Sequence, residues 1–371
     1  MIALVHRVIF CALVWASSLR AACPSGCECS EAAQTVKCVS KDLREVPSGI
    51  PGYTRNLFIM GNQISRIGPE SFKGLENVTN LSLSNNRITE VESQTFSALR
   101  SLRSLDLSSN QLALIHPEAF AVPSGLLRDL NLSRSLYNHS SVADLATALR
   151  WGGLRGLLRL DLSGNRLVLL PLGMFSPLPG LRRLQLGNNS LVAVHNGTFA
   201  GLEQLEELDL TLNAFKTFQE EALLELERLP HARLLLADNP YVCACGIEDF
   251  TAWLNGSRAR VGDAERVACA SPPELRNASL RGLGERALGC HGDGAGEGAD
   301  LALQTSYVFL GVVLGFVGVV FLFVLYLNRK GIKKWIVDSR DACRDVLEGY
   351  HYRYEIDSDP RLAQVSTSGD L

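Results

Sequence analysis

A recurring spacing of leucines and asparagines constrains this 371-residue chain more than any other feature. Residues 102–112 (LRSLDLSSNQL) follow the pattern L-x-x-L-x-L-x-x-N-x-L. The same frame recurs at intervals of 24 to 30 residues, with its asparagine position at Asn62, Asn86, Asn110, Ser135, Asn165, Asn189, Asn213 and Asn239. A period of this length indicates one elongated stack of coils rather than several globular domains.

Each frame predicts a short strand followed by a bend. The leucines at frame positions 4 and 6 flank one outward residue, as a strand requires. The asparagine amide can satisfy backbone groups that the bend would otherwise leave buried and unpaired. Ten residues past this position comes a phenylalanine, which predicts a stacked spine on the convex side: Phe72, Phe96, Phe120, Phe175 and Phe199.

The pattern is that of a leucine-rich repeat. It predicts an α/β solenoid over residues 51–238, with a curved concave parallel sheet and an irregular or helical convex side. Ser135 interrupts the asparagines, and residues 137–156 make the fourth coil the longest. Val142, Leu145 and Leu149 follow a helical spacing there, so we expect a convex-side helix. This segment is either a tolerated insertion, which a surface accommodates at low cost, or a functional protrusion.

Eight of the ten cysteines form two clusters at the ends of the array. A terminal coil has no neighbour to cover its apolar face, so a cap is required at each end. We therefore expect cysteine caps at residues 23–50 and 239–290, closed by disulfides in an oxidising compartment. Zinc binding by four cysteines is the alternative, and the secretory context disfavours it.

The remaining segments predict a single-pass membrane protein. Residues 1–22 resemble a signal peptide, and residues 291–305 a short stalk. Residues 306–327 form an apolar segment long enough for one transmembrane helix. Basic residues follow it and acidic residues precede it, which predicts a type I protein of the plasma membrane with an extracellular N-terminus. Residues 328–371 are then a cytosolic tail, whose phosphorylation candidates are Tyr350, Tyr352 and Tyr354.

Motifs for catalysis are absent from the sequence. The seven histidines are scattered, and no nucleotide-binding, metal-binding or nucleophile motif occurs. The net charge of −3 does not favour a nucleic-acid partner, because a chain with net negative charge is not, as a whole, attracted to a polyanion. We expect a binding protein that is not an enzyme, with no cofactor and an extracellular protein ligand or co-receptor as partner.

The concave face is the candidate binding surface. Phe58 and Met60 stand out there as large apolar residues on the first repeat strand, with Asn56 and Arg55 beside them. The alternative is that the N-terminal cap folds over them. Eight N-glycosylation sequons occur, at Asn77, Asn80, Asn131, Asn138, Asn188, Asn196, Asn255 and Asn277. Asn80 and Asn131 project from concave strands, so their glycans would shield the middle of this face and leave Phe58 outside the shielded zone.

Both cysteine clusters resemble the caps of extracellular leucine-rich repeat proteins. The resemblance implies the pairs Cys23–Cys29 and Cys27–Cys38 in the first cap, and Cys243–Cys269 and Cys245–Cys290 in the second.

The whole arrangement, together with the tail segments 333–335 (KKW), 343–356 (CRDVLEGYHYRYEI) and 359–362 (DPRL), resembles the trophoblast glycoprotein family. That resemblance implies a cell-surface antagonist of Wnt/β-catenin signalling that acts at the Wnt co-receptor and affects adhesion and motility. The family's C-terminus resembles a PDZ ligand, but Gly369 stands where a hydroxyl residue is needed, which makes a PDZ partner doubtful. An auxiliary subunit of an ion channel and a plain cell-adhesion molecule share this organisation and remain alternatives.

Overall fold

The computed structural model describes residues 23–122, 125–256, 260–283 and 288, and in addition 313–322, 326–329, 331 and 333. The chain divides into two units, Met1–His291 and Gly292–Leu371. The predicted signal peptide, the stalk, Cys290 and the three tail tyrosines lie outside the described residues.

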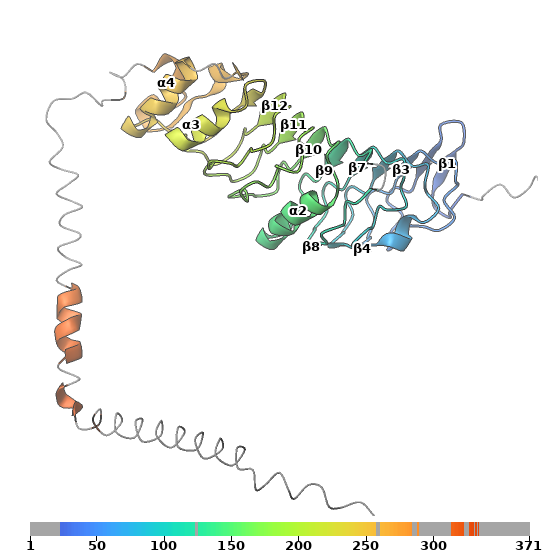
Figure 1. Ribbon diagram of the computed structural model, residues 1–371, viewed down its shortest axis with the longest axis horizontal. Helices are drawn as coiled ribbons and strands as arrows, with labels where there is room; N and C mark the ends of the chain where they lie inside the picture. Colours follow the sequence, from blue (N-terminus) through green and yellow to red (C-terminus); the bar gives the residue numbers. More distant parts are fainter. Residues whose placement is uncertain are drawn as a thin grey trace, which may run out of the picture. The chain divides into compact units, whose positions relative to one another are not determined.

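One sheet of 11 short strands runs along one side of the first unit (Figure 1). Its neighbouring strands are all parallel, except for the antiparallel pair β1 and β2 at the N-terminal end. In sheet order the strands are β1 (Glu28–Ser30), β2 (Thr35–Lys37), β3 (Asn56–Phe58), β5 (Asn80–Ser82), β7 (Ser104–Asp106), β9 (Asp129–Asn131), β10 (Arg159–Asp161), β11 (Arg183–Gln185), β12 (Glu207–Asp209), β13 (Arg233–Leu235) and β15 (Arg260–Val261). The predicted concave parallel sheet is thus present.

Each repeat strand is centred on a buried leucine. These central residues are at most 2% exposed: Leu57, Leu81, Leu105, Leu130, Leu160, Leu184, Leu208 and Leu234. The strand covers frame positions 3 to 5, so its centre is position 4, which points into the core, and the outward residue at position 5 is its last residue. Burial of one leucine contributes about 1.5–3 kcal/mol, so the stack of leucines dominates the stability of the solenoid.

The frame asparagines connect successive coils through buried hydrogen bonds. Asn86 Nδ2 donates to the carbonyl oxygens of Ile59 and Leu83, both at 2.7 Å, and its Oδ1 accepts from the Asn62 N–H at 3.1 Å. In the irregular repeat the Ser135 hydroxyl donates to the Leu107 carbonyl at 2.8 Å. Serine therefore keeps one of the bonds that the asparagine side chain makes elsewhere.

The phenylalanine spine is buried and stacked. The ring centroids of Phe72 and Phe96 are 5.6 Å apart, those of Phe96 and Phe120 are 6.4 Å apart, and those of Phe175 and Phe199 are 6.3 Å apart. A second sheet, in the order β4 (Arg66–Ile67), β6 (Glu90–Val91) and β8 (Leu114–Ile115), joins the early coils away from the concave strands.

Helix α2 (His139–Trp151) occupies the long fourth coil and packs against β8 (Figure 1). Asn138 caps its N-terminus, where Oδ1 accepts from the Ser141 N–H at 3.0 Å. Val142, Leu145 and Leu149 are buried, which confirms the helix expected from their spacing. A shorter helix, α3 (Glu220–Glu227), covers a later coil.

Cysteine caps close both ends, and both extend the main sheet. Cys23 is bonded to Cys29, Cys27 to Cys38 and Cys243 to Cys269. These are three of the pairs that the family resemblance implies; Cys245 is also disulfide-bonded. Because β1, β2 and β15 belong to the caps, residues 51 and 238 do not mark the ends of the sheet.

The C-terminal cap covers the last coil with aromatic side chains. Helix α4 (Glu248–Gly256) buries Phe250, Trp253 and Leu254. Beside it β14 (Tyr241–Val242) pairs in parallel with β16 (Cys269–Ser271). The Tyr241 hydroxyl donates to the Leu236 carbonyl at 2.7 Å, and burial raises the pKa of this phenol. The closely packed side chains of the C-terminal cap therefore cover the last coil, as a further repeat would.

The second unit is described only in part. Residues 313–322 are helical, as are 326 and 327. Among the residues that the structure describes, none belongs to a helix both long enough and apolar enough to cross a bilayer. The predicted span of residues 306–327 extends beyond these described segments.

Candidate binding surface

The N-terminal end of the concave face carries a hollow of about 580 Å³ between the cap and the first repeat. Strands β1, β2 and β3 form it, because Lys37 is the register partner of both Glu28 and Phe58. The lining residues are Glu28, Cys29, Ser30, Ala33, Thr35, Lys37, Asn56 and Phe58. An aromatic ring, a cation and several hydrogen-bonding groups thus meet at one end of the sheet.

Phe58 is half-buried at the wall of this hollow. The cap does not fold over the ring: it adds two strands beside it, so that β3 is the third strand of the sheet and not the first. The Cys38 N–H donates to the Phe58 carbonyl at 2.7 Å and fixes the backbone at this position. Phe58 is therefore neither a core residue nor fully exposed, as a binding anchor requires.

The other three candidates lie close to Phe58 in different environments. Asn56 lines the hollow, and its Nδ2 donates to Thr35 Oγ1 at 3.3 Å. Met60 is half-buried just beyond the strand, and Arg55 is exposed just before it. Asn56 and Phe58 thus share one surface, while Met60 and Arg55 flank it.

Lys37 is the residue that sequence reasoning missed. It is exposed and lies beside Phe58 on the neighbouring strand. The repeat pattern did not reveal the position of Lys37 on the sheet, because β2 precedes the first recognisable repeat frame. The alternation of Thr35, buried Val36 and Lys37 was the available signal, since it is the pattern of a strand with one buried face.

The middle of the concave face uses its polar groups internally. Aspartates at frame position 5 hold the bends after their strands: Oδ1 of Asp106, Asp161 and Asp209 accepts from the N–H two residues on, at 3.0, 2.8 and 2.9 Å. Arg159 forms an ion pair with Asp129, and this contact raises the pKa of the arginine. These side chains bond to groups within the solenoid, so fewer of their polar atoms are free to bind a partner.

Seven of the eight sequon asparagines are exposed, and Asn131 is half-buried in the central concave face. Asn80 Nδ2 donates to Asn56 Oδ1 at 2.6 Å, one strand away from Phe58. Neighbouring strands are about 4.8 Å apart, so Asn80 lies close to the hollow. That Phe58 lies outside the zone that glycans on Asn80 and Asn131 shield most stays a prediction.

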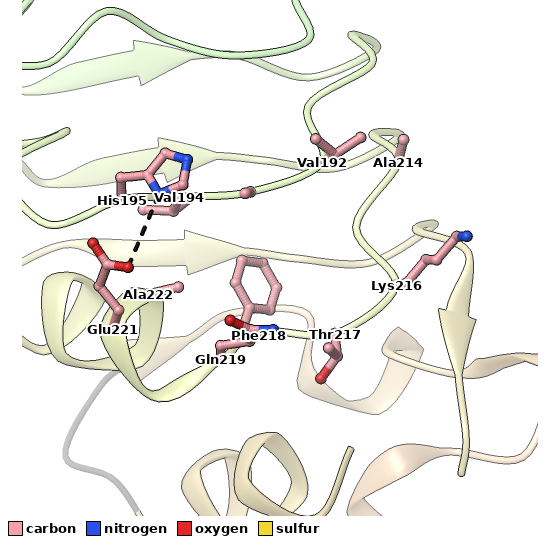
Figure 2. A pocket seen from close by; sticks show the side chains of 11 residues that line it. Val192, Val194, His195, Ala214, Lys216, Thr217, Phe218, Gln219, Glu221 and Ala222 are labelled. Atoms are coloured by element: carbon pink, nitrogen blue, oxygen red, sulfur yellow. Dashed lines mark ion pairs between the residues drawn. The ribbon is translucent and has the colours of Figure 1, made fainter. Parts of the chain in front are cut away.

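A separate hollow of about 340 Å³ lies beside α3, away from the concave strands (Figure 2). His195 and Glu221 approach each other at its edge, with 3.9 Å between Nδ1 and Oε2. Apolar side chains, among them Val192, Val194 and Phe218, form much of the lining. Over the described residues, no group of three or more histidines, cysteines or carboxylates is placed to hold a metal ion.

A solenoid of parallel strands closed by disulfide-bonded caps is the architecture of an extracellular leucine-rich repeat protein. The family model "Leucine rich repeat" matches residues 53–112 and 179–240.

Comparison with individual proteins identifies the family more closely. Trophoblast glycoprotein from Homo sapiens is 48% identical over 366 residues, with 94% of this chain and 86% of that protein covered. The Mus musculus protein is 43% identical with the same coverage. The crystal structure of human 5T4 (Wnt-activated inhibitory factor 1, trophoblast glycoprotein) has a TM-score of 0.66 and 40% identity, over 73% of this chain and 99% of that one. The chain belongs to the trophoblast glycoprotein family and thus to the cell-surface leucine-rich repeat glycoproteins.

Proposed function

We propose that this protein is a single-pass type I glycoprotein of the plasma membrane that antagonises Wnt/β-catenin signalling at the Wnt co-receptor. Its ectodomain binds a protein partner through the N-terminal hollow of the concave face, and its effects on adhesion and motility follow from that binding. The human relative of known structure is also called Wnt-activated inhibitory factor 1, and this name supports the choice of pathway.

The observation that carries the binding site is the pairing of half-buried Phe58 with exposed Lys37. Aromatic residues held in partly desolvated positions are typical hot spots, because they bury a large area with little loss of side-chain entropy. Lys37 adds a cation, so a partner with an apolar side chain next to a carboxylate fits this hollow. Glu28, the register partner of Lys37 on the far side, would disfavour a second carboxylate.

The proposed topology rests on the sequence. The uncharged stretch of residues 307–327 is long enough to span a bilayer, and the basic residues Arg329, Lys330, Lys333 and Lys334 follow it. The disulfides of both caps fit an oxidising compartment.

Replacement of Phe58 and Lys37 tests the proposal. Phe58→Ala and Lys37→Ala, expressed at matched surface density, should weaken inhibition of a Wnt-response reporter. The loss of binding free energy should reach about 2 kcal/mol for Phe58 if it is a hot spot. Leu114→Ala is the matched control, because Leu114 is 43% exposed on β8 in the other sheet. Unchanged inhibition by both hollow variants would reject this site.

Exchange of domains separates this function from the alternatives. In a chimera with a foreign segment at residues 306–334, a Wnt antagonist keeps its activity, whereas an auxiliary channel subunit that acts through its span loses it. A cell-aggregation assay tests the adhesion alternative, which predicts aggregation of expressing cells without any effect on the reporter.

A further inference from the structure

Seven arginines gather at the edge of the main sheet where β7, β9, β10 and β11 begin, strands that lie side by side in Figure 1. Each is the first residue of its strand or lies at most four residues before it: Arg100, Arg103, Arg128, Arg155, Arg159, Arg182 and Arg183. These residues, here called the arginine row, fall in segments 100–105, 125–130, 155–160 and 180–185. Six of them are exposed and Arg128 is half-buried. Asp129 is the one carboxylate in the four segments, so this edge is strongly positive.

Stacking of the coils makes neighbours of residues that are far apart in sequence. The Arg128 N–H donates to the Arg103 carbonyl at 2.8 Å. The Leu158 N–H donates to the Arg128 carbonyl at 2.8 Å, and the Arg182 N–H donates to the Leu158 carbonyl at 2.9 Å. Because neighbouring strands are about 4.8 Å apart, the row forms a line of cations along the axis of the solenoid.

Much of this positive charge has no partner within the solenoid. Over the described residues, four of the seven arginines form no ion pair: Arg103, Arg128, Arg155 and Arg183. The Arg128 guanidinium donates instead to the Gly156 carbonyl at 2.5 Å. The other three have one carboxylate each: Glu76 for Arg100, Asp129 for Arg159 and Glu206 for Arg182. Guanidinium N–H groups are therefore available to an anionic ligand.

The net charge of −3 does not oppose such binding, because charges act locally. At physiological ionic strength the screening length is about 8 Å, so a polyanion at the row responds mainly to the arginines beside it. The next coil carries three carboxylates at the same edge, Glu203, Glu206 and Glu207, and these end the row.

We propose that the arginine row binds a sulfated glycosaminoglycan, such as heparan sulfate, whose chain lies along the axis of the solenoid. The inference rests on the proposed extracellular location and involves no Wnt component. A planar guanidinium can donate two parallel N–H bonds to one oxyanion. A linear polyanion reaches several arginines at once, so contacts that are weak individually give a useful affinity together.

The composition of the row favours a polysaccharide over an acidic protein or a lipid surface. Among the described residues, none of the four segments has an exposed large apolar side chain. Protein interfaces use aromatic and apolar anchors at their centre, and binding to a lipid surface gains from apolar side chains that enter the bilayer. The row offers charge at a regular spacing without such anchors, which fits a regular sulfated polymer.

Binding of heparan sulfate to the full-length protein tests the inference. The protein is produced in mammalian cells, purified in a neutral detergent and captured on a sensor surface. Heparan sulfate, hyaluronan, poly-glutamate and phosphatidylserine vesicles are then applied in turn at physiological salt. We expect heparan sulfate to bind and the other three not to bind. Hyaluronan is the informative comparison, because it is a polysaccharide with carboxylates but no sulfate.

Two triple variants separate the row from the overall charge. The row variant combines Arg103→Gln, Arg155→Gln and Arg183→Gln. The matched control combines Arg87→Gln, Arg150→Gln and Arg166→Gln, which removes the same charge from exposed positions outside the row. We expect at least about tenfold weaker binding of heparan sulfate by the row variant, with a slope of log affinity against log salt that falls by about 2–3. The control should bind as wild type does, and lysine at the three row positions should keep the salt slope.

Three results would overturn the inference. Equal losses in the two triple variants would show that the overall charge attracts the polymer and that the row is not a site. Hyaluronan, poly-glutamate or vesicles that bind as tightly as heparan sulfate would reject the class of partner. Wild-type protein that does not bind heparan sulfate would reject both. If this protein still inhibits the Wnt reporter, the proposed function stands without the row, whereas binding without inhibition rejects the proposed function alone.

Discussion

Ser135 donates its backbone N–H to Oδ1 of Asn165 across 2.7 Å, although 30 residues separate the two. Asn165 also accepts from the Leu136 N–H at 2.7 Å, and its Nδ2 donates to the carbonyls of Leu132 and Leu162 at 2.9 and 2.8 Å. One side chain therefore connects the irregular fourth coil to the regular coil that follows. Together with the pairing of β9 and β10, this residue keeps the array continuous across the insertion.

Asn165→Ala should destabilise the ectodomain strongly. The substitution leaves the Leu132 carbonyl and the N–H groups of Ser135 and Leu136 without their side-chain partner, whereas the Leu162 carbonyl keeps a bond from Asn189 Nδ2. Each unpaired group costs about 1–3 kcal/mol. We expect a loss of at least about 3 kcal/mol in the free energy of unfolding, measured by urea denaturation. Ser135→Ala is the control, because it removes the bond to the Leu107 carbonyl alone and should cost about 1 kcal/mol. Equal losses in the two variants would contradict this account.

The two disulfides of the N-terminal cap should contribute unequally to stability. Cys38 is fully buried and follows β2, whereas Cys23 is exposed. Chain entropy assigns about 2–3 kcal/mol to either bond, but loss of the Cys27–Cys38 bond also disturbs core packing. We expect the pair Cys27→Ser with Cys38→Ala to lower the melting temperature more than Cys23→Ser with Cys29→Ser.

The same comparison reports on the binding hollow, because the Cys38 N–H holds the Phe58 carbonyl. We expect the Cys27–Cys38 variant to lose partner binding at temperatures where the Cys23–Cys29 variant retains it. Identical melting and binding in both variants would show that the buried bond has no special role.

The repeat frame predicted the sheet, its buried leucines and the phenylalanine spine, because each follows from a spacing that local geometry imposes on every coil. It did not predict the position of Lys37, since the hairpin of β1 and β2 lies outside the frame and its pairing with Phe58 is a tertiary contact. Nor does the frame alone show that Asn80 contacts Asn56 in the hollow, because a separation of 24 residues in sequence becomes one strand spacing in the solenoid.

Glu225 shows the same limit of sequence reasoning. It lies in an ordinary amphipathic run on α3, yet it is only 2% exposed. Its carboxylate accepts from the N–H groups of Phe199 at 2.7 Å and Gly197 at 3.0 Å, and from Arg228 at 3.0 Å. No local pattern distinguishes it from its neighbour Glu227, because its backbone partners belong to the preceding coil.

Glu225→Gln should destabilise the protein more than Glu227→Gln. The amide of glutamine turns an N–H donor toward a backbone N–H and weakens the charge-assisted bonds, for an expected cost of about 2–3 kcal/mol. Glu227 is exposed on the same helix, so its substitution should change stability by less than about 0.5 kcal/mol. Thermal unfolding of both variants gives the comparison, and a Glu225→Gln protein that melts with wild type would show that the carboxylate is replaceable.

The ectodomain with any membrane anchor should suffice for Wnt antagonism. The repeats and caps form the large ordered surface, and the hollow beside Phe58 lies within them. By contrast, the predicted tail has Gly369 at the position where a PDZ ligand needs a hydroxyl residue. On the proposed topology, its basic residues at 329–334 attract anionic lipid by about 1 kcal/mol each, which serves topology rather than recognition. Truncation after Lys334, at matched surface density, should therefore leave reporter inhibition at the wild-type level.

The opposing argument is the tyrosine cluster, because phosphorylation of Tyr350, Tyr352 or Tyr354 adds charge that recruits a partner. The tail would have the signalling role instead if inhibition is lost in the truncated protein. Inhibition should then also be lost in the full chain when the three tyrosines are changed to phenylalanine.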